Sequence, residues 1–138
     1  MAVETCAGYN LRRTSRVVTQ LFDTALEPTG LRSTQAAILQ MIVATNSGSV
    51  AELARELAMD PSTLTRNLQP LIREGYVDLV NAPRGRAKLA RLTTQGRAKL
   101  DQVLVHWKQA QAEFVKRFGA KRWNQLRAEL TAVAEVLR

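Results

Sequence analysis

The chain has 138 residues, 46% of which are hydrophobic, and carries a formal net charge of +8. This size and composition exclude a disordered chain and support one domain with a hydrophobic core. The charge indicates a polyanionic partner, but its sign alone does not distinguish nucleic acid from an acidic membrane surface or an acidic protein. Because the sequence has neither an apolar run long enough to span a membrane nor a signal-peptide pattern, we expect a cytoplasmic protein without membrane contact.

Two helices are predicted in the first third of the chain. An amphipathic helix runs from about residue 6 to residue 26, with Leu11 and Phe22 on its apolar face. Pro28 and Gly30 end it, since the residue before a proline avoids the helical conformation and glycine permits a reversal. Ser33 is the expected N-cap of a second helix, which is apolar nearly all round and therefore predicts a central strut.

The next segment, residues 49–92, has the order of elements that a winged helix-turn-helix requires. Ser49 and Glu52 form a capping-box pattern at the start of a short helix, and Asp60-Pro61 marks a second helix start. The outer face of this second helix is polar and basic, with the side-chain types that read base edges or bind phosphate. An ordinary solvated helix face has a similar composition. The candidate DNA-binding residues are Ser62, Arg66, Gln69 and Arg73 on this face, with Thr63, Thr65 and Asn67 on its flanks.

A hairpin with a basic tip is predicted after this helix. Pro70 predicts a bend in the helix, because the apolar stripe continues beyond it, and Gly75 ends the helix. Residues 77–80 and 88–92 are short strand candidates, joined by a turn that carries Arg84 and Arg86. Arginines on such a wing are able to enter the narrow minor groove of A·T-rich DNA, and the alternative is a merely soluble loop.

Two further helices with long apolar stripes are predicted in the C-terminal third, which also holds most of the excess basic charge. Thr94 is the expected cap of the first of them, and Gly119 separates it from the second. Because the stripes are longer than a core of this size covers, we expect pairing with a second copy; an intramolecular hairpin is the alternative. The expected dimerisation residues here are Leu100, Trp107, Phe114, Trp123, Leu126, Leu130, Val133 and Leu137.

Residue types that carry metal or covalent chemistry are scarce. A single histidine, His106, and a single cysteine, Cys6, cannot assemble a zinc site within one chain, and no phosphate-binding glycine loop is present. We therefore expect no metal, no cofactor and no enzymatic activity. Cys6 also cannot form an internal disulfide, which agrees with a reducing compartment.

Several short motifs follow one another at a specific spacing. They are Gly30-Leu31 with Gln35, Val50-Ala51-Glu52-Leu53-Ala54, Ser62-Thr63-Leu64-Thr65-Arg66, Gly75-Tyr76-Val77, Arg86 and Leu92-Thr93-Thr94-Gln95-Gly96. Together they resemble the MarR (multiple antibiotic resistance regulator) family over nearly the whole chain. The resemblance implies one MarR-like domain over residues 1–138, mostly α with a small β-hairpin wing. Its winged helix-turn-helix would cover about residues 33–92, and its dimerisation helices about residues 6–27, including Leu11, and 94–137.

The same resemblance implies a homodimeric transcriptional regulator, here expected to be a repressor, that binds a near-palindromic operator in double-stranded DNA. A small aromatic or phenolic effector, or oxidation, would release the DNA. Family wings carry an aspartate two residues before the arginine that Arg86 matches, and that position is Arg84 here, so the acidic partner that would fix Arg86 is missing.

Cys6 is a candidate redox sensor, because it lies near the position of the reactive cysteine in hydroperoxide-sensing members of the family. The helix N-terminus and nearby Arg12 and Arg13 favour the reactive thiolate. The alternative is a lone thiol without function. For the whole chain, the alternative is a non-specific basic architectural or interaction protein without base readout.

Overall fold

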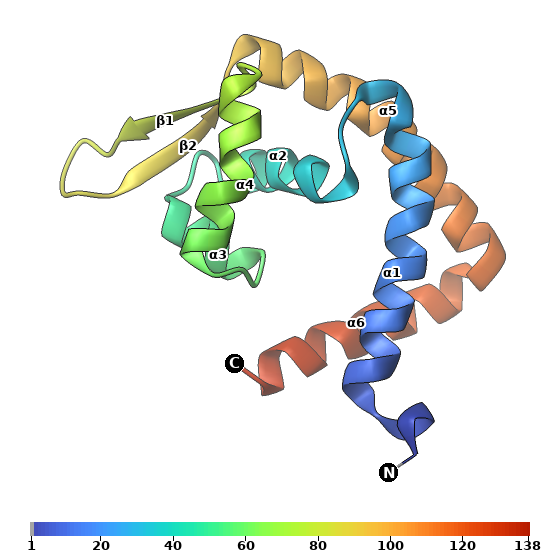
Figure 1. Ribbon diagram of the computed structural model, residues 1–138. Helices are drawn as coiled ribbons and strands as arrows, with labels where there is room; N and C mark the ends of the chain where they lie inside the picture. Colours follow the sequence, from blue (N-terminus) through green and yellow to red (C-terminus); the bar gives the residue numbers. More distant parts are fainter. Residues whose placement is uncertain (1) are drawn as a thin grey trace.

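The computed structural model describes residues 2–138, which are mostly helical with one two-stranded hairpin (Figure 1). This confirms the predicted fold class. In chain order the elements are η1 (Val3–Thr5), α1 (Ala7–Leu26), η2 (Glu27–Thr29), α2 (Ser33–Ala44), α3 (Val50–Glu56), α4 (Pro61–Arg73), β1 (Val77–Asn81), β2 (Lys88–Leu92), α5 (Thr94–Phe118) and α6 (Ala120–Val136). Within residues 2–138, no helix combines the length and the apolar character needed to cross a membrane.

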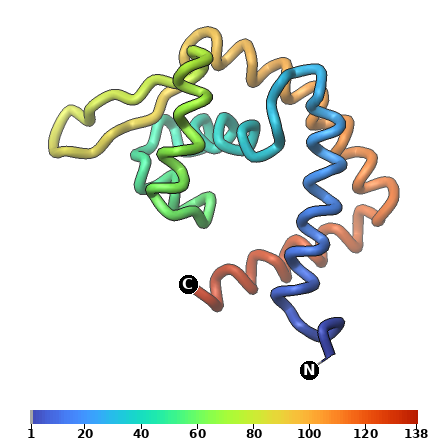
Figure 2. Tube along the Cα trace, in the orientation of Figure 1, coloured from blue at the N-terminus to red at the C-terminus, as the bar shows by residue number. Residues whose placement is uncertain are grey.

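The elements form a winged lobe, residues 33–92, and a helical scaffold of α1, α5 and α6. Long helices α1 and α5 pack against each other, and α6 crosses near the lower part of α1 (Figures 1 and 2). The antiparallel hairpin, which pairs Val77 with Leu92 and Asn81 with Lys88, projects at the left, opposite the turn between α5 and α6. The hairpin and the turn between α5 and α6 therefore lie at opposite sides of the molecule, and the first turn of α5 lies beside β2.

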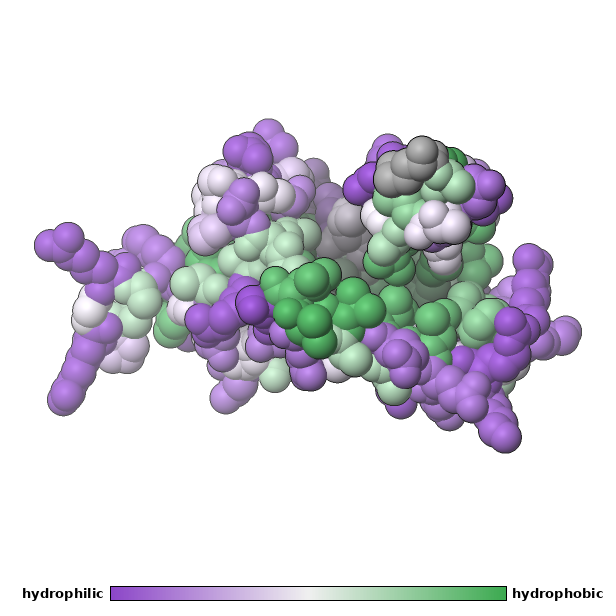
Figure 3. Space-filling view, turned by 90° about the horizontal axis from the view of Figure 1, so that it is seen from below, coloured by the Kyte–Doolittle hydropathy of each residue, from purple (hydrophilic) through white to green (hydrophobic). Residues whose placement is uncertain are grey.

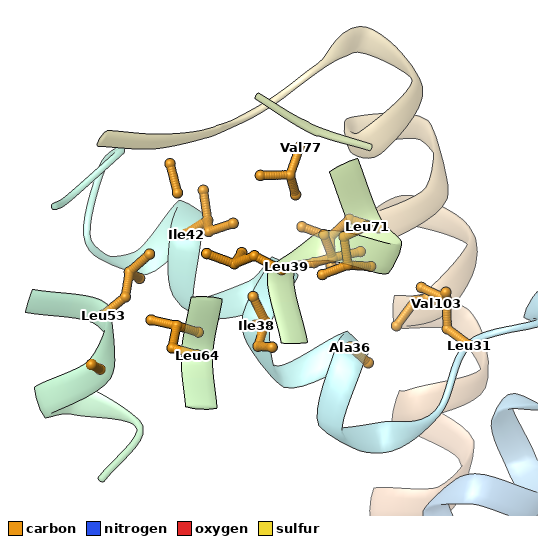
Figure 4. Close-up of a cluster of buried hydrophobic side chains, with 14 of the residues drawn as sticks. Leu31, Ala36, Ile38, Leu39, Ile42, Leu53, Leu64, Leu71, Val77 and Val103 are labelled. Atoms are coloured by element: carbon orange, nitrogen blue, oxygen red, sulfur yellow. The ribbon is translucent and has the colours of Figure 1, made fainter. Parts of the chain in front are cut away.

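The core is centred on α2 of the winged lobe and extends to the end of α1 and to α5 (Figure 4). Ile38, Leu39 and Ile42 of α2 are fully or almost fully buried, which confirms the expected central strut. The side chains packed around them come from α3, α4, both strands and α5, and include Leu53, Leu64, Leu68, Leu71, Val77 and Val103. Each buried leucine contributes roughly 1.5–3 kcal/mol relative to an exposed one. This burial fixes which face of α4 is turned outward.

The predicted N-cap of α2 is wrong by one residue. Ser33 is the first residue of α2, and Arg32 occupies the cap position. The free backbone donors find acceptors elsewhere: the N–H of Arg32 donates to Gln35 Oε1 at 2.9 Å, and that of Ser33 donates to Asp23 Oδ1 at 2.7 Å. Because Asp23 belongs to α1, this cap also ties the scaffold to the winged lobe.

The predicted N-cap of α5 is wrong by one residue as well. Thr93, not Thr94, caps the helix by accepting the Gly96 N–H at 2.9 Å. The same hydroxyl donates to the backbone carbonyl of Gly75 at the end of α4. Thr93 is therefore held by a contact 18 residues away along the chain as well as by its own helix.

Candidate nucleic-acid interface

Helices α3 and α4 form the predicted helix-turn-helix. Ser49 caps α3 by accepting the Glu52 N–H at 3.1 Å. The turn between the helices includes Ala58, whose φ of 52° is left-handed, and the Met59 N–H returns to the Ala54 carbonyl at 2.8 Å. Asp60 occupies the N-cap position of α4, but its side chain makes no capping hydrogen bond. The reversal is therefore held mainly by backbone contacts.

The outer face of α4 presents the candidate DNA-binding side chains. Leucines at three positions of α4 have no exposed surface, so the opposite face points away from the core. On that side Ser62, Thr65, Arg66, Gln69 and Arg73 are exposed, and Thr63 and Asn67 are half-buried. The structure therefore brings together all seven residues that the sequence assigns to this face and its flanks.

Local contacts leave the arginines of α4 available. Arg66 Nη2 donates to Thr63 Oγ1 at 3.3 Å, and the Thr65 hydroxyl donates to the Pro61 carbonyl at 2.9 Å. Within residues 2–138 the one ion pair joins Arg117 to Glu113, so neither arginine of α4 is neutralised by a carboxylate. A phosphate or a base edge would meet an uncompensated guanidinium there.

Helix α4 continues through Pro70 and ends where the sequence predicts. The helix runs unbroken over Pro61–Arg73, so Pro70 does not divide it, and the predicted bend stays a prediction. Gly75 has a φ of 79°, and the next residue, Tyr76, returns its N–H to the Leu71 carbonyl at 2.9 Å. This left-handed glycine confirms the predicted helix end.

The wing has a basic and exposed tip. Arg84 and Arg86 flank Gly85, whose φ of 82° permits the turn, and all three residues are exposed. Neither arginine has a carboxylate partner within the described residues. Figure 3 shows the hydrophilic wing extending at the far left, away from the body of the molecule. The wing is thus free of contacts that would hold these arginines away from a ligand.

Two further exposed basic residues, Lys88 and Arg91 of β2, are not among the candidate DNA-binding residues named from the sequence. The Nζ atom of Lys88 donates to Asn81 Oδ1 at 2.6 Å across the hairpin, and Arg91 lies opposite Asp78 in the strand register. The signal was present, since a charged residue in a short amphipathic strand is expected to face solvent.

An apolar groove of about 480 Å³ runs between α1, α5 and α6. Five of the expected dimerisation residues line this groove: Leu11, Phe114, Trp123, Leu126 and Leu130. The ring of Phe114 contacts that of Trp123 edge-on, with 5.1 Å between centroids. Figure 3, which views the molecule from below relative to Figure 1, shows hydrophobic side chains on the side that faces the viewer.

The end of α6 extends the same apolar surface. Val133 is 42% exposed and Leu137 is 80% exposed, although both are hydrophobic. Leu100, by contrast, is only 5% exposed and belongs to the core of the single chain. Its side chain is thus already covered within one chain, and its assignment to a dimer interface stays a prediction.

A second, smaller groove of about 220 Å³ lies between the scaffold and the winged lobe. Phe22 of α1 and Trp107 of α5 supply its aromatic side chains, with 6.2 Å between ring centroids. Ser33, Ala37 and Gln40 of α2 supply the opposite wall. Trp107 therefore lines a groove that touches both parts of the molecule.

Cys6 occupies the N-cap position of α1 and is half-buried. Its backbone carbonyl accepts from the N–H of Asn10 at 3.0 Å and from the Asn10 side-chain amide at 2.9 Å. The helix start is thereby ordered around the cysteine. Among residues 2–138, no group of three or more histidine, cysteine, aspartate or glutamate side chains is placed to hold a metal ion.

Comparison with known proteins gives consistent matches. The MarR family model matches residues 29–87, whereas a search of curated protein sequences returns no significant match. The M. tuberculosis transcriptional regulator MosR, solved in complex with DNA, is 36% identical, with a TM-score of 0.83 over 96% of this chain and 98% of that one.

Two Rhodococcus structures are also similar. A transcriptional regulator of the MarR family from Rhodococcus sp. RHA1 is 27% identical, with a TM-score of 0.83 over 97% of this chain and 96% of that one. CouR from Rhodococcus jostii RHA1, bound to p-coumaroyl-CoA, is 25% identical, with a TM-score of 0.81 over 97% of this chain and 95% of that one.

Proposed function

Because the chain belongs to the MarR family of DNA-binding transcriptional regulators, we propose that it is a repressor that binds a specific operator as a homodimer. The observation that carries the proposal is the set of exposed, uncompensated arginines on the winged lobe, at Arg66, Arg73, Arg84 and Arg86. The outer face of α4 would enter the major groove, and the wing tip would reach an adjacent minor groove. The similarity to transcriptional regulators argues against an enzymatic role.

A second copy of the chain is the best occupant for the apolar groove. The groove and the exposed end of α6 form one hydrophobic surface on the scaffold, away from the wing. Covering such a surface with an identical one removes both from water and gives a two-fold interface. The α4 helices of the two copies would then act as recognition helices about 34 Å apart. This distance is one turn of DNA and fits a near-palindromic operator.

Release of the DNA requires a change in the distance between the two winged lobes of the dimer. A small aromatic or phenolic ligand suits the groove beside Phe22 and Trp107, because ring-lined cavities favour flat apolar ligands. This ligand would touch both the scaffold and α2, so its binding is able to favour one arrangement over another. The relative CouR was solved bound to p-coumaroyl-CoA, whose acyl group is a phenol, and this supports the phenolic character of the ligand.

Oxidation of Cys6 is the second candidate trigger, supported by the position of the thiol at the start of a scaffold helix. An oxidised thiol would pass through sulfenic acid and then form a disulfide with another thiol. Since the chain has a single cysteine, that thiol would come from the partner subunit or from an external molecule.

A competition experiment tests the proposed function. Fluorescence anisotropy at one fixed salt concentration would compare displacement of a labelled duplex from the promoter beside the protein's own gene by unlabelled promoter and by random duplexes of the same length. A specific regulator is expected to prefer the promoter, since specific sites are bound about 10³–10⁷-fold more tightly than random DNA. Equal competition by both would instead support a non-specific basic protein.

A further inference from the structure

Lys99 of α5 joins three segments that are far apart in the sequence. Its Nζ atom donates to the backbone carbonyl of Thr29 at 2.9 Å and to Gln102 Oε1 at 3.0 Å. The same ammonium lies 5.6 Å from the centroid of the Tyr76 ring. Thr29 stands at the corner between α1 and α2, and Tyr76 follows the end of α4. One half-buried charge on the scaffold therefore contacts both the entrance to the winged lobe and the exit of its recognition helix.

Two of the three partners of Lys99, Thr29 and Tyr76, are themselves held in place. Thr29 is 4% exposed, and its hydroxyl donates to the Leu26 carbonyl at 2.6 Å and accepts the Leu31 N–H at 3.1 Å. The Thr29 carbonyl, which Lys99 contacts, is therefore held in a fixed position. A charge-assisted hydrogen bond to a carbonyl is stronger than a neutral one, and the surrounding burial limits competition from water.

Tyr76 is pressed against α5 by its backbone. Its carbonyl accepts the Thr93 N–H at 3.0 Å, and a Cβ atom placed on Gly96 would lie only 1.9 Å from that carbonyl oxygen. The Tyr76 N–H also returns to the Leu71 carbonyl inside α4 at 2.9 Å. A displacement of Tyr76 relative to α5 would therefore move the end of α4 with it.

We propose that Lys99 is a positioning residue that sets the angle between the recognition helix and the dimerisation helices. The proposal rests on the proposed function, because that angle decides how far apart the two recognition helices of a dimer stand. The hydrogen bond to Thr29 ties α5 to the segment that leads into the winged lobe, and the cation–π contact with Tyr76 ties it to the segment that follows α4. Loss of the ammonium removes both contacts and leaves the backbone bond from Thr93 to Tyr76 and the shared core to hold the lobe, so its angle on α5 is less narrowly set.

A distance measurement in the absence of DNA tests this role. Spin labels at Glu56 of α3 and Gln109 of α5, both exposed, are introduced as cysteines in a C6S background. The labelled protein is diluted with unlabelled chain, so that double electron–electron resonance measures only distances within one chain. We expect K99M, which keeps the aliphatic stem, to broaden the distance distribution.

Three further variants complete the design. K99R retains a donor and a charge and should restore a narrow distribution; Y76L removes only the ring and should broaden it less than K99M. K116M, which removes an exposed lysine at the far end of α5, should leave the distribution unchanged. Identical distributions for the wild type, K99M and Y76L would overturn the proposal.

Operator spacing supplies a second readout that a merely structural role would not move. K99M should keep its affinity for a duplex with one half-site but lose the preference for the natural half-site separation over one lengthened by a base pair. An equal loss on both duplexes would contradict positioning. If the wild type binds all DNA equally while K99M still broadens the distances, the proposed function fails and the role of Lys99 in orienting the lobe stands.

Discussion

Replacing Arg66 with alanine tests the outer face of α4 directly. Arg66 is exposed, and its one side-chain hydrogen bond, to Thr63 Oγ1, is 3.3 Å long. Such a surface substitution changes the free energy of unfolding by about 0.5 kcal/mol or less. Alanine is also the best helix former, so α4 should persist. A change in DNA affinity would therefore report the contact with DNA and not the stability of the fold.

The expected loss follows from the kind of contact that Arg66 makes. If the guanidinium reads a base edge, R66A should weaken binding at the operator by about 1–3 kcal/mol. This corresponds to a dissociation constant roughly 5- to 150-fold higher. Binding to a scrambled duplex should fall much less, because a lost base contact affects only the sequence that supplied it.

Fluorescence anisotropy at constant ionic strength provides the assay, with the operator and a scrambled duplex titrated in parallel. K116A is the matched control, because it removes one positive charge from an exposed position at the far end of α5. Thermal unfolding of both variants would establish that they are folded. A loss of the same size on both duplexes would make Arg66 a phosphate contact, and no loss on either would remove α4 from the interface.

Other substitutions examine the remaining parts of the molecule. G96A should lower the free energy of unfolding by about 1–3 kcal/mol, because the added Cβ meets the Tyr76 carbonyl; an unchanged urea midpoint would contradict this close approach. R84A should weaken binding more to operators with A·T-rich flanks than to G·C-rich ones, and an equal loss would indicate a phosphate contact. L130R places a charge in the apolar groove and should yield monomers by light scattering, whereas an unchanged mass would place the interface elsewhere. Organic hydroperoxide should release DNA from the wild type but not from C6S; release from both would exclude Cys6 as the sensor.

Features set by neighbouring residues could be predicted from the sequence. The buried stripe of α4 needs only leucines at helical spacing, and its end needs only Gly75, whose positive φ few other residues adopt. The hairpin likewise follows from two short apolar runs on either side of a turn. These local signals placed the recognition helix and the wing, which together carry the candidate DNA contacts.

Features set by distant contacts could not be predicted in the same way. Ser33 looks like a cap from its neighbours, but the structure satisfies its N–H with Asp23 of another helix. Leu100 continues an apolar stripe that suggests a partner, yet it is buried in the core of the single chain. The contact of Lys99 with Thr29 spans 70 residues, and no periodicity in the sequence points to it. Such contacts depend on how the scaffold and the lobe meet, which local pattern does not specify.

Whether the protein binds a two-fold operator as a homodimer is best decided by selection from a random library of duplexes. The bound duplexes are sequenced, and the enriched sequence is footprinted. We expect inverted half-sites with centres about 10–10.5 base pairs apart, each protected on the same side of the duplex. A library from which no motif emerges, or a footprint of one uninterrupted and sequence-independent stretch, would contradict this expectation.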